Sequence, residues 1–210
     1  MTDSSRRFPS PADAQFKILC WVVRIALLGG LLIGLVFDLS QLEGKGWGAR
    51  AVFYTLVVFV LPVAWRLSGK RFAYSYVADA LLVAPFALDI LGNLFGLYDS
   101  LESFDDILHF LNWALLTACF TVSISRSSSV GRLNLISLGT GFGATMIVLW
   151  ELMEFCVMKL GTERLHLTYE DTVGDISLST FGGFVSSLIV GMLAKRKRQE
   201  NQPLSTNQEV

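Results

Sequence analysis

The sequence predicts an all-α integral membrane protein, a bundle of six transmembrane helices with both termini in the cytoplasm. Two observations lead to this prediction. Of the 210 residues, 52% are hydrophobic and only 17% are charged, with a mean hydropathy of +0.52, whereas soluble domains are about 25% charged. Six apolar windows also approach the ~20 residues needed to cross a bilayer. They cover residues 17–37, 51–67, 77–97, 107–124, 134–158 and 174–194.

The first three segments read as follows. Segment 17–37 follows basic residues as a signal peptide would, but its apolar run is too long and no small-residue cleavage site follows, so it is a retained helix. Segment 51–67 is apolar up to Arg66, near its end. Segment 77–97 begins beside Asp79 and carries Asp89 and Asn93 four residues apart, on one helical face.

The last three segments each combine apolar residues with polar ones. Segment 107–124 opens after two aspartates and carries His109. Segment 134–158 contains the glycine-rich stretch LGTGFGA, which predicts close helix packing because no strand precedes it, as a nucleotide-binding loop would require. Segment 174–194 also contains small residues, Gly182 and Gly183 among them.

The six segments leave no room for a soluble domain. Residues 1–16 form a cytoplasmic N-terminal segment, 17–194 the six-helix domain and 195–210 a disordered cytoplasmic tail, because KRKRQENQPLSTNQEV is polar and lacks periodicity. Its basic cluster suits anionic lipid headgroups, and beside a transmembrane helix it does not indicate nucleic-acid binding. Membrane lipids are therefore the predicted partners of a multi-pass membrane protein.

Lys and Arg residues predict the orientation, because cytoplasmic loops are enriched in them. Most of the 17 basic residues lie in the N-terminal segment, in the loops at 66–76 and 125–133, and in the tail. The acidic residues gather at the opposite ends of the segments. The cytoplasm should therefore hold both termini, and the outer face should attract cations.

An ionisable side chain at membrane depth costs about 2.5 kcal/mol or more, so each one needs a partner or a purpose. Arg24 and Asp79 lie near the cytoplasmic ends of their segments, where an ion pair or snorkelling to the interface explains both. A larger group lies roughly 5–12 Å below the outer end of four helices, at about 1.5 Å per residue. Its members are Asp89, Asn93, His109, Asn112, Glu151, Glu154 and Asp175.

Helix capping explains part of this polar group. Asp105 or Asp106 can cap the fourth helix, and Asp171 or Thr172 the sixth. Glu151 and Glu154 lie inside the fifth segment, where capping cannot use them. Close carboxylates repel unless they share a proton or a cation, so a positive charge should lie there.

Three residue pairs at helical spacing converge on the outer end: Asp106 with His109, Glu151 with Glu154, and Asp171 with Asp175. Their spacing resembles that of the pairs by which helical bundles bind one or two divalent metals. Oxygen ligands with one imidazole suit zinc, manganese, iron or magnesium. The predicted metal ligands are His109, Glu151, Glu154 and Asp175. Asp106 or Asp171 is predicted to act as the catalytic base or to orient a metal ligand.

The stretches FDDILHFLNWAL, WELMEF and DTVGDISLSTFGG resemble the bacterial inner-membrane YjdF-like family of unknown function and, more distantly, the VanZ-like membrane proteins. The resemblance spans about residues 75–194. It implies a small polytopic helical bundle in the bacterial inner membrane. It also implies a shared signature of Asp-x-x-His, Trp-Glu-x-x-Glu and Asp-Thr-x-x-Asp, and no established reaction.

The leading functional hypothesis is a metal-dependent membrane hydrolase of a lipid-linked or phosphorylated envelope substrate, since a bound metal activates water. A cation or proton-coupled transporter is the alternative, and it requires polar groups that continue toward the cytoplasm. A non-catalytic scaffold or lipid-binding protein is the third reading. It requires the carboxylates to pair only with Lys159, Arg164 or helix N-termini.

Overall fold

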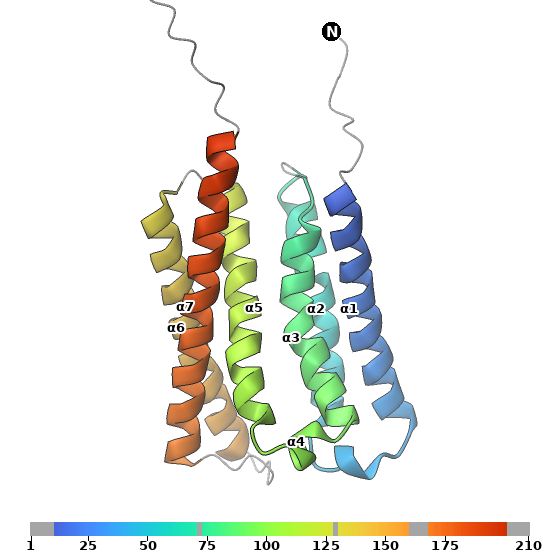
Figure 1. Ribbon diagram of the computed structural model, residues 1–210. Helices are drawn as coiled ribbons and strands as arrows, with labels where there is room; N and C mark the ends of the chain where they lie inside the picture. Colours follow the sequence, from blue (N-terminus) through green and yellow to red (C-terminus); the bar gives the residue numbers. More distant parts are fainter. Residues whose placement is uncertain (1–10, 71–72, 128–129, 160–167, 201–210) are drawn as a thin grey trace, which may run out of the picture.

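In the computed structural model the described residues, 11–70, 73–127, 130–159 and 168–200, form helices and turns without a strand (Figure 1). The six long helices are α1 (Pro11–Val36), α2 (Trp47–Leu67), α3 (Tyr76–Leu94), α5 (Phe104–Ser127), α6 (Arg132–Lys159) and α7 (Tyr169–Glu200). Two short elements, η1 (Ser40–Leu42) and α4 (Leu97–Ser100), lie between them. Each long helix contains a stretch long and apolar enough to cross a membrane. The predicted six-helix membrane bundle is confirmed.

The helix ends differ from the predicted segments where local chemistry overrides hydropathy. Segment 77–97 was predicted as one helix, but α3 ends at Leu94 because Gly96 adopts a left-handed φ of 64°, a common way to terminate a helix. Conversely, α5 and α7 begin several residues before the apolar windows, because their first turns are polar. At the other end of α7 the helix continues to Glu200, into the range predicted as a tail, while 1–10 and 201–210 lie outside the described residues.

The helices form two groups of three (Figure 1). The first half contains α1, α2 and α3, in which α1 packs against both of the others, and the second half contains α5, α6 and α7, which all contact one another. Contacts between α3 and α5 join the halves. The beginning of α1 and the end of α7 lie at the same end of the bundle (Figure 1). Which side of the membrane this end faces stays a prediction.

The first half has an apolar core. Leu27, Val83 and Ile90 are completely buried, and the indole of Trp47 donates to the carbonyl of Leu31 over 3.1 Å. Of the two explanations given for Arg24 and Asp79, an ion pair or snorkelling, the ion pair is present: a guanidinium nitrogen of Arg24 lies 2.6 Å from a carboxylate oxygen of Asp79. These contacts fix α1 against α3.

The Asp79 carboxylate also accepts hydrogen bonds from Cys20 and Tyr74. Burial and the neighbouring carboxylate raise the pKa of Tyr74, so its hydroxyl remains a donor. Three side chains from two segments thus stabilise one buried charge.

The second half is packed through small residues. A Cβ atom on Gly182 of α7 would collide with the backbone carbonyl of Phe110 on α5, and Gly143 and Gly183 both face Thr117. Without side chains at these positions the helix backbones can approach closely. The predicted close packing of the glycine-rich stretches is therefore present, and it brings His109 of α5 beside α7.

Candidate functional site

The candidate site lies at the acidic end of the bundle, defined here as the end where α6 finishes and where α5 and α7 begin (Figure 1). Asp105 and Asp106 are in the first turn of α5, and Asp171 is in the first turn of α7. The positive ends of these two helix dipoles favour carboxylates. Glu151 and Glu154 of α6 receive no such support, because they lie toward the C-terminal end of their helix.

His109 is at the centre of this end. Its Nε2 lies 3.5 Å from a carboxylate oxygen of Asp175 and 3.9 Å from one of Asp105. One possible ligand atom from each of the three residues lies within 4.8 Å of the other two. We call Asp105, His109 and Asp175 the triad. Asp175 is buried, with 3% of its surface exposed, whereas 51% of the Asp105 side chain is exposed, so the triad reaches the surface on one side only.

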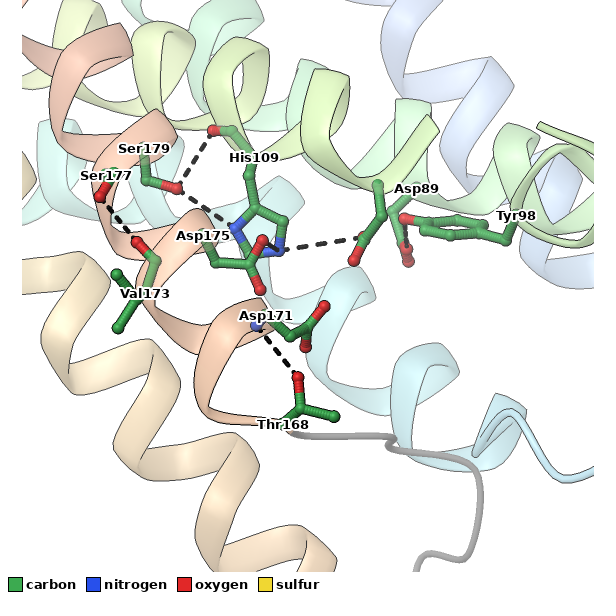
Figure 2. A network of polar contacts seen from close by, with 10 residues as sticks. Asp89, Tyr98, His109, Thr168, Asp171, Val173, Asp175, Ser177 and Ser179 are labelled. Atoms are coloured by element: carbon green, nitrogen blue, oxygen red, sulfur yellow. Dashed lines mark hydrogen bonds and ion pairs between the residues drawn. The ribbon is translucent and has the colours of Figure 1, made fainter. Parts of the chain in front are cut away.

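Ser179 of α7 contacts the imidazole of His109. Its hydroxyl lies 3.2 Å from Nδ1 of His109 and donates to the backbone carbonyl of the same residue over 3.4 Å. With its proton on that carbonyl, the hydroxyl oxygen can accept from Nδ1–H, and in that tautomer the lone pair of the ring is on Nε2. Figure 2 shows this arrangement, with one ring nitrogen toward Ser179 and the other toward the carboxylates.

A lone pair facing two carboxylate oxygens is repulsive unless a positive charge lies between them. A proton or a metal ion can supply that charge. A neutral imidazole whose other nitrogen donates to a hydrogen-bond acceptor is the usual form of a metal-binding histidine. The triad therefore has the chemistry of a divalent cation site.

Glu151 is the most unusual carboxylate of the acidic end. Only 6% of the residue is exposed, and neither of its side-chain oxygens has a hydrogen-bond partner. It is close enough to Asp105 and Asp171 to interact with them electrostatically. A buried carboxylate without a partner is costly, so a ligand with positive charge would stabilise it.

The remaining predicted site residues lie at the same end of the bundle and differ in how far they are buried. Glu154, one turn after Glu151, is half-buried and interacts electrostatically with it. Asp106 and Asp171 are exposed, and both interact electrostatically with His109. Capping of α7 is performed by Thr168, whose hydroxyl accepts from the backbone N–H of Asp171 over 3.1 Å. The Asp171 carboxylate is therefore left without a capping role.

Asp89 and Asn93, which the sequence placed in the same polar layer, form a separate cluster in the first half. Asp89 accepts from Arg50 over 3.0 Å, from Tyr98 over 2.8 Å and from the amide of Asn93. Burial and the carboxylate raise the pKa of Tyr98, which remains a donor. This carboxylate needs no further partner. Lys45 similarly pairs with Asp99 over 2.7 Å.

Two residues of the site were missed by the sequence analysis. Asp105 was considered only as a helix cap, and Ser179 was not considered. Helical spacing could have found both, since Asp105 precedes His109 by four residues and Ser179 follows Asp175 by four. Glu163, Arg164 and His166, between α6 and α7 in the sequence, lie outside the described residues.

Comparison with known proteins gives one match. Residues 14–196 match a family described as "Predicted membrane protein (DUF2238)". The match covers all six candidate membrane spans and agrees with the expected YjdF-like resemblance, while it gives no support for the VanZ-like one. No curated protein and no solved structure matches the chain.

Proposed function

The chain belongs to the DUF2238 family of predicted membrane proteins, and we propose that it is a metal-dependent membrane hydrolase whose divalent ion is bound by the triad. The observation that carries the proposal is the position of Nε2 of His109 beside oxygens of Asp105 and Asp175 from two different helices. No Lys or Arg of the described residues forms an ion pair with these carboxylates. A cation from solution is the simplest partner.

Each group of the site has a defined task in this proposal. A divalent ion would supply Lewis acidity and activate water. Ser179 holds the imidazole in the tautomer that exposes Nε2. Asp106 and Asp171 are exposed beside the triad and can accept a proton from water. Apolar side chains beside them, such as Ile107 and Val173, are exposed on the surface, which suits a lipid-linked envelope substrate.

The proposal includes a location. The positive-inside rule places the acidic end on the outer face of the membrane, and for a bacterial inner membrane this face meets envelope intermediates. A fusion reporter at the C-terminus measures the orientation directly. A periplasmic C-terminus would move the acidic end to the cytoplasm and exclude an envelope substrate.

Metal content is the decisive measurement. We expect the detergent-purified protein to retain a divalent ion, and the His109→Ala, Asp175→Asn variant to lose the triad's ion. Asp99→Asn, which removes an exposed carboxylate at the same end, is the matched control and should retain the metal content of the wild type. If the wild type holds no stoichiometric metal and added zinc, manganese, iron or magnesium does not shift its thermal unfolding, the proposal is wrong.

Cation or proton transport is the second candidate, and one observation favours it. Thr117, Thr121, Ser179 and Ser187 are completely buried between α5 and α7, and the Thr117 hydroxyl has no partner. However, Thr121 and Ser187 each donate to a carbonyl of their own helix, which stabilises the helix without requiring a path. Ion or proton flux into sealed vesicles, abolished by Thr117→Val, would support transport.

A further inference from the structure

We propose that the acidic end binds two divalent ions, the second held by Glu151, and that the two together bind a phosphate or diphosphate group of the substrate. This inference rests on the proposed function and names the substrate class of the same site. It depends on three observations: the lack of any hydrogen-bond partner for the Glu151 carboxylate, the charge of the acidic end, and the absence of Glu151 from the triad's group of ligand atoms.

Glu151 is a buried carboxylate without a local explanation. Both of its oxygens lack a hydrogen-bond partner, and the residue lies within α6, where capping is impossible. Its place toward the C-terminal end of the helix makes a negative charge less favourable still. A cation bound directly by its oxygens removes both penalties.

The charge of the acidic end exceeds what one ion can neutralise. Asp175 interacts electrostatically with four other carboxylates, those of Asp105, Asp171, Glu151 and Glu154. With Asp106, in the first turn of α5, these residues make six carboxylates, of whose negative charge one divalent ion would offset at most two units and two ions four. Lys159, the basic residue at the end of α6, lies over the ring of Phe155.

The triad's group of ligand atoms does not include Glu151. The three ligand atoms lie within 4.8 Å of one another. An ion bound by those three atoms would leave the Glu151 oxygens without a partner. Glu154 is three residues from Glu151 on the same face of α6. Asp175, buried at the same end of the bundle, would be shared between the two ions.

Two neighbouring divalent ions have a characteristic chemistry. At about 3.5–4 Å apart they stabilise both the attacking and the leaving oxygen in phosphoryl transfer. Two divalent ions would supply four positive charges and offset most of the carboxylate charge, so an anionic phosphate could approach. Exposed apolar side chains of α6 at this depth, Leu152 and Phe155, would contact the acyl or prenyl chain of a lipid phosphate.

Metal stoichiometry separates this inference from the proposed function. We expect two ions for each wild-type chain, one for the Glu151→Gln, Glu154→Gln variant, and two for Glu170→Gln, an exposed carboxylate in the first turn of α7. A single ion in the wild type overturns the two-ion site but leaves the triad site intact. Two ions in the double glutamine variant overturn the assignment to Glu151. No ion in the wild type overturns both proposals.

A measurement on the wild type alone guards against misfolding of the variants. When the protein is loaded with Mn²⁺, two neighbouring ions should give the multiline electron paramagnetic resonance spectrum of a spin-coupled pair. A spectrum of isolated Mn²⁺ would overturn the inference.

Inorganic phosphate tests the substrate class. It should raise the melting temperature of the metal-loaded wild type and leave that of the metal-loaded double glutamine variant unchanged. An equal rise in both would show that phosphate does not require the second ion, and would overturn this part of the inference.

Discussion

The two halves of the bundle stabilise buried carboxylates in opposite ways. In the first half Asp79 pairs with Arg24 and Asp89 pairs with Arg50, and hydroxyl, thiol or amide donors add hydrogen bonds to these carboxylates. In the second half the corresponding groups, Asp175 and Glu151 among them, have no arginine or lysine partner within the part of the chain that the structure describes.

The two halves also differ in the side chains that pack their cores. Large apolar side chains such as Leu27 and Ile90 fill the first half, whereas glycines and hydroxyl groups fill the contacts of α5, α6 and α7. The first half is therefore built for stability and the second for close approach of polar groups. Unpaired buried charge is a feature of functional sites, which sacrifice stability for binding.

The largest expected effect is the loss of a first-half charge partner. Replacing Arg24 with Leu should lower the free energy of unfolding by about 3–5 kcal/mol, because Asp79 is left buried without its cation. Thermal unfolding in detergent measures the change. The Arg24→Leu, Asp79→Leu double variant is the control and should recover most of the loss, since apolar residues of similar volume replace the pair. If the Arg24→Leu variant were as stable as the wild type, the two halves would not differ in how they stabilise buried carboxylates.

A smaller effect is expected from the packing of the second half. The Gly182→Ala substitution should cost about 1–3 kcal/mol, the usual cost of overpacking, because the new Cβ collides with the carbonyl of Phe110. It should also reduce metal retention by separating α5 from α7. Gly141→Ala is the matched control, since a Cβ there meets no atom within 4 Å. Equal stability of the two variants would mean that the close approach is not required.

Much of this architecture could be predicted from the sequence, because lipid requires long apolar stretches and because a constant helical rise converts residue number into depth. That reasoning placed His109, Glu151 and Asp175 at one end, where the structure has them. It could not place the stop at Gly96, which depends on a left-handed backbone conformation.

The pairing of charges was harder to predict. Arg50 and Asp89 are 39 residues apart, and their contact depends on which helices are neighbours. Hydropathy does not contain this information. The sequence analysis consequently grouped Asp89 with the carboxylates of the second half, although its arginine separates it from them. Arg24 and Asp79 could be matched because both residues were expected near the cytoplasmic ends of their segments, at a similar depth in the membrane.

The smallest expected effect is a stabilisation, whereas the two substitutions above destabilise the protein. In the presence of a chelator, Glu151→Gln should raise the free energy of unfolding by about 1–2 kcal/mol, because it removes a buried charge that has no partner and is repelled by Asp105 and Asp171. Glu170→Gln, at an exposed position, should change it by less than about 0.5 kcal/mol. Thermal unfolding in detergent with and without metal measures both.

Adding metal should reverse the order of stability, so that the wild type has a larger free energy of unfolding than the Glu151→Gln variant. A ligand that binds only the folded state stabilises it by about 2.7 kcal/mol at a concentration 100-fold above its dissociation constant, and the variant loses the share of this gain that depends on Glu151. Destabilisation by Glu151→Gln in chelator would instead mean that Glu151 already has a favourable partner, as Asp79 and Asp89 do. The second half would then follow the same rule as the first, and the case for a cation at Glu151 would be lost.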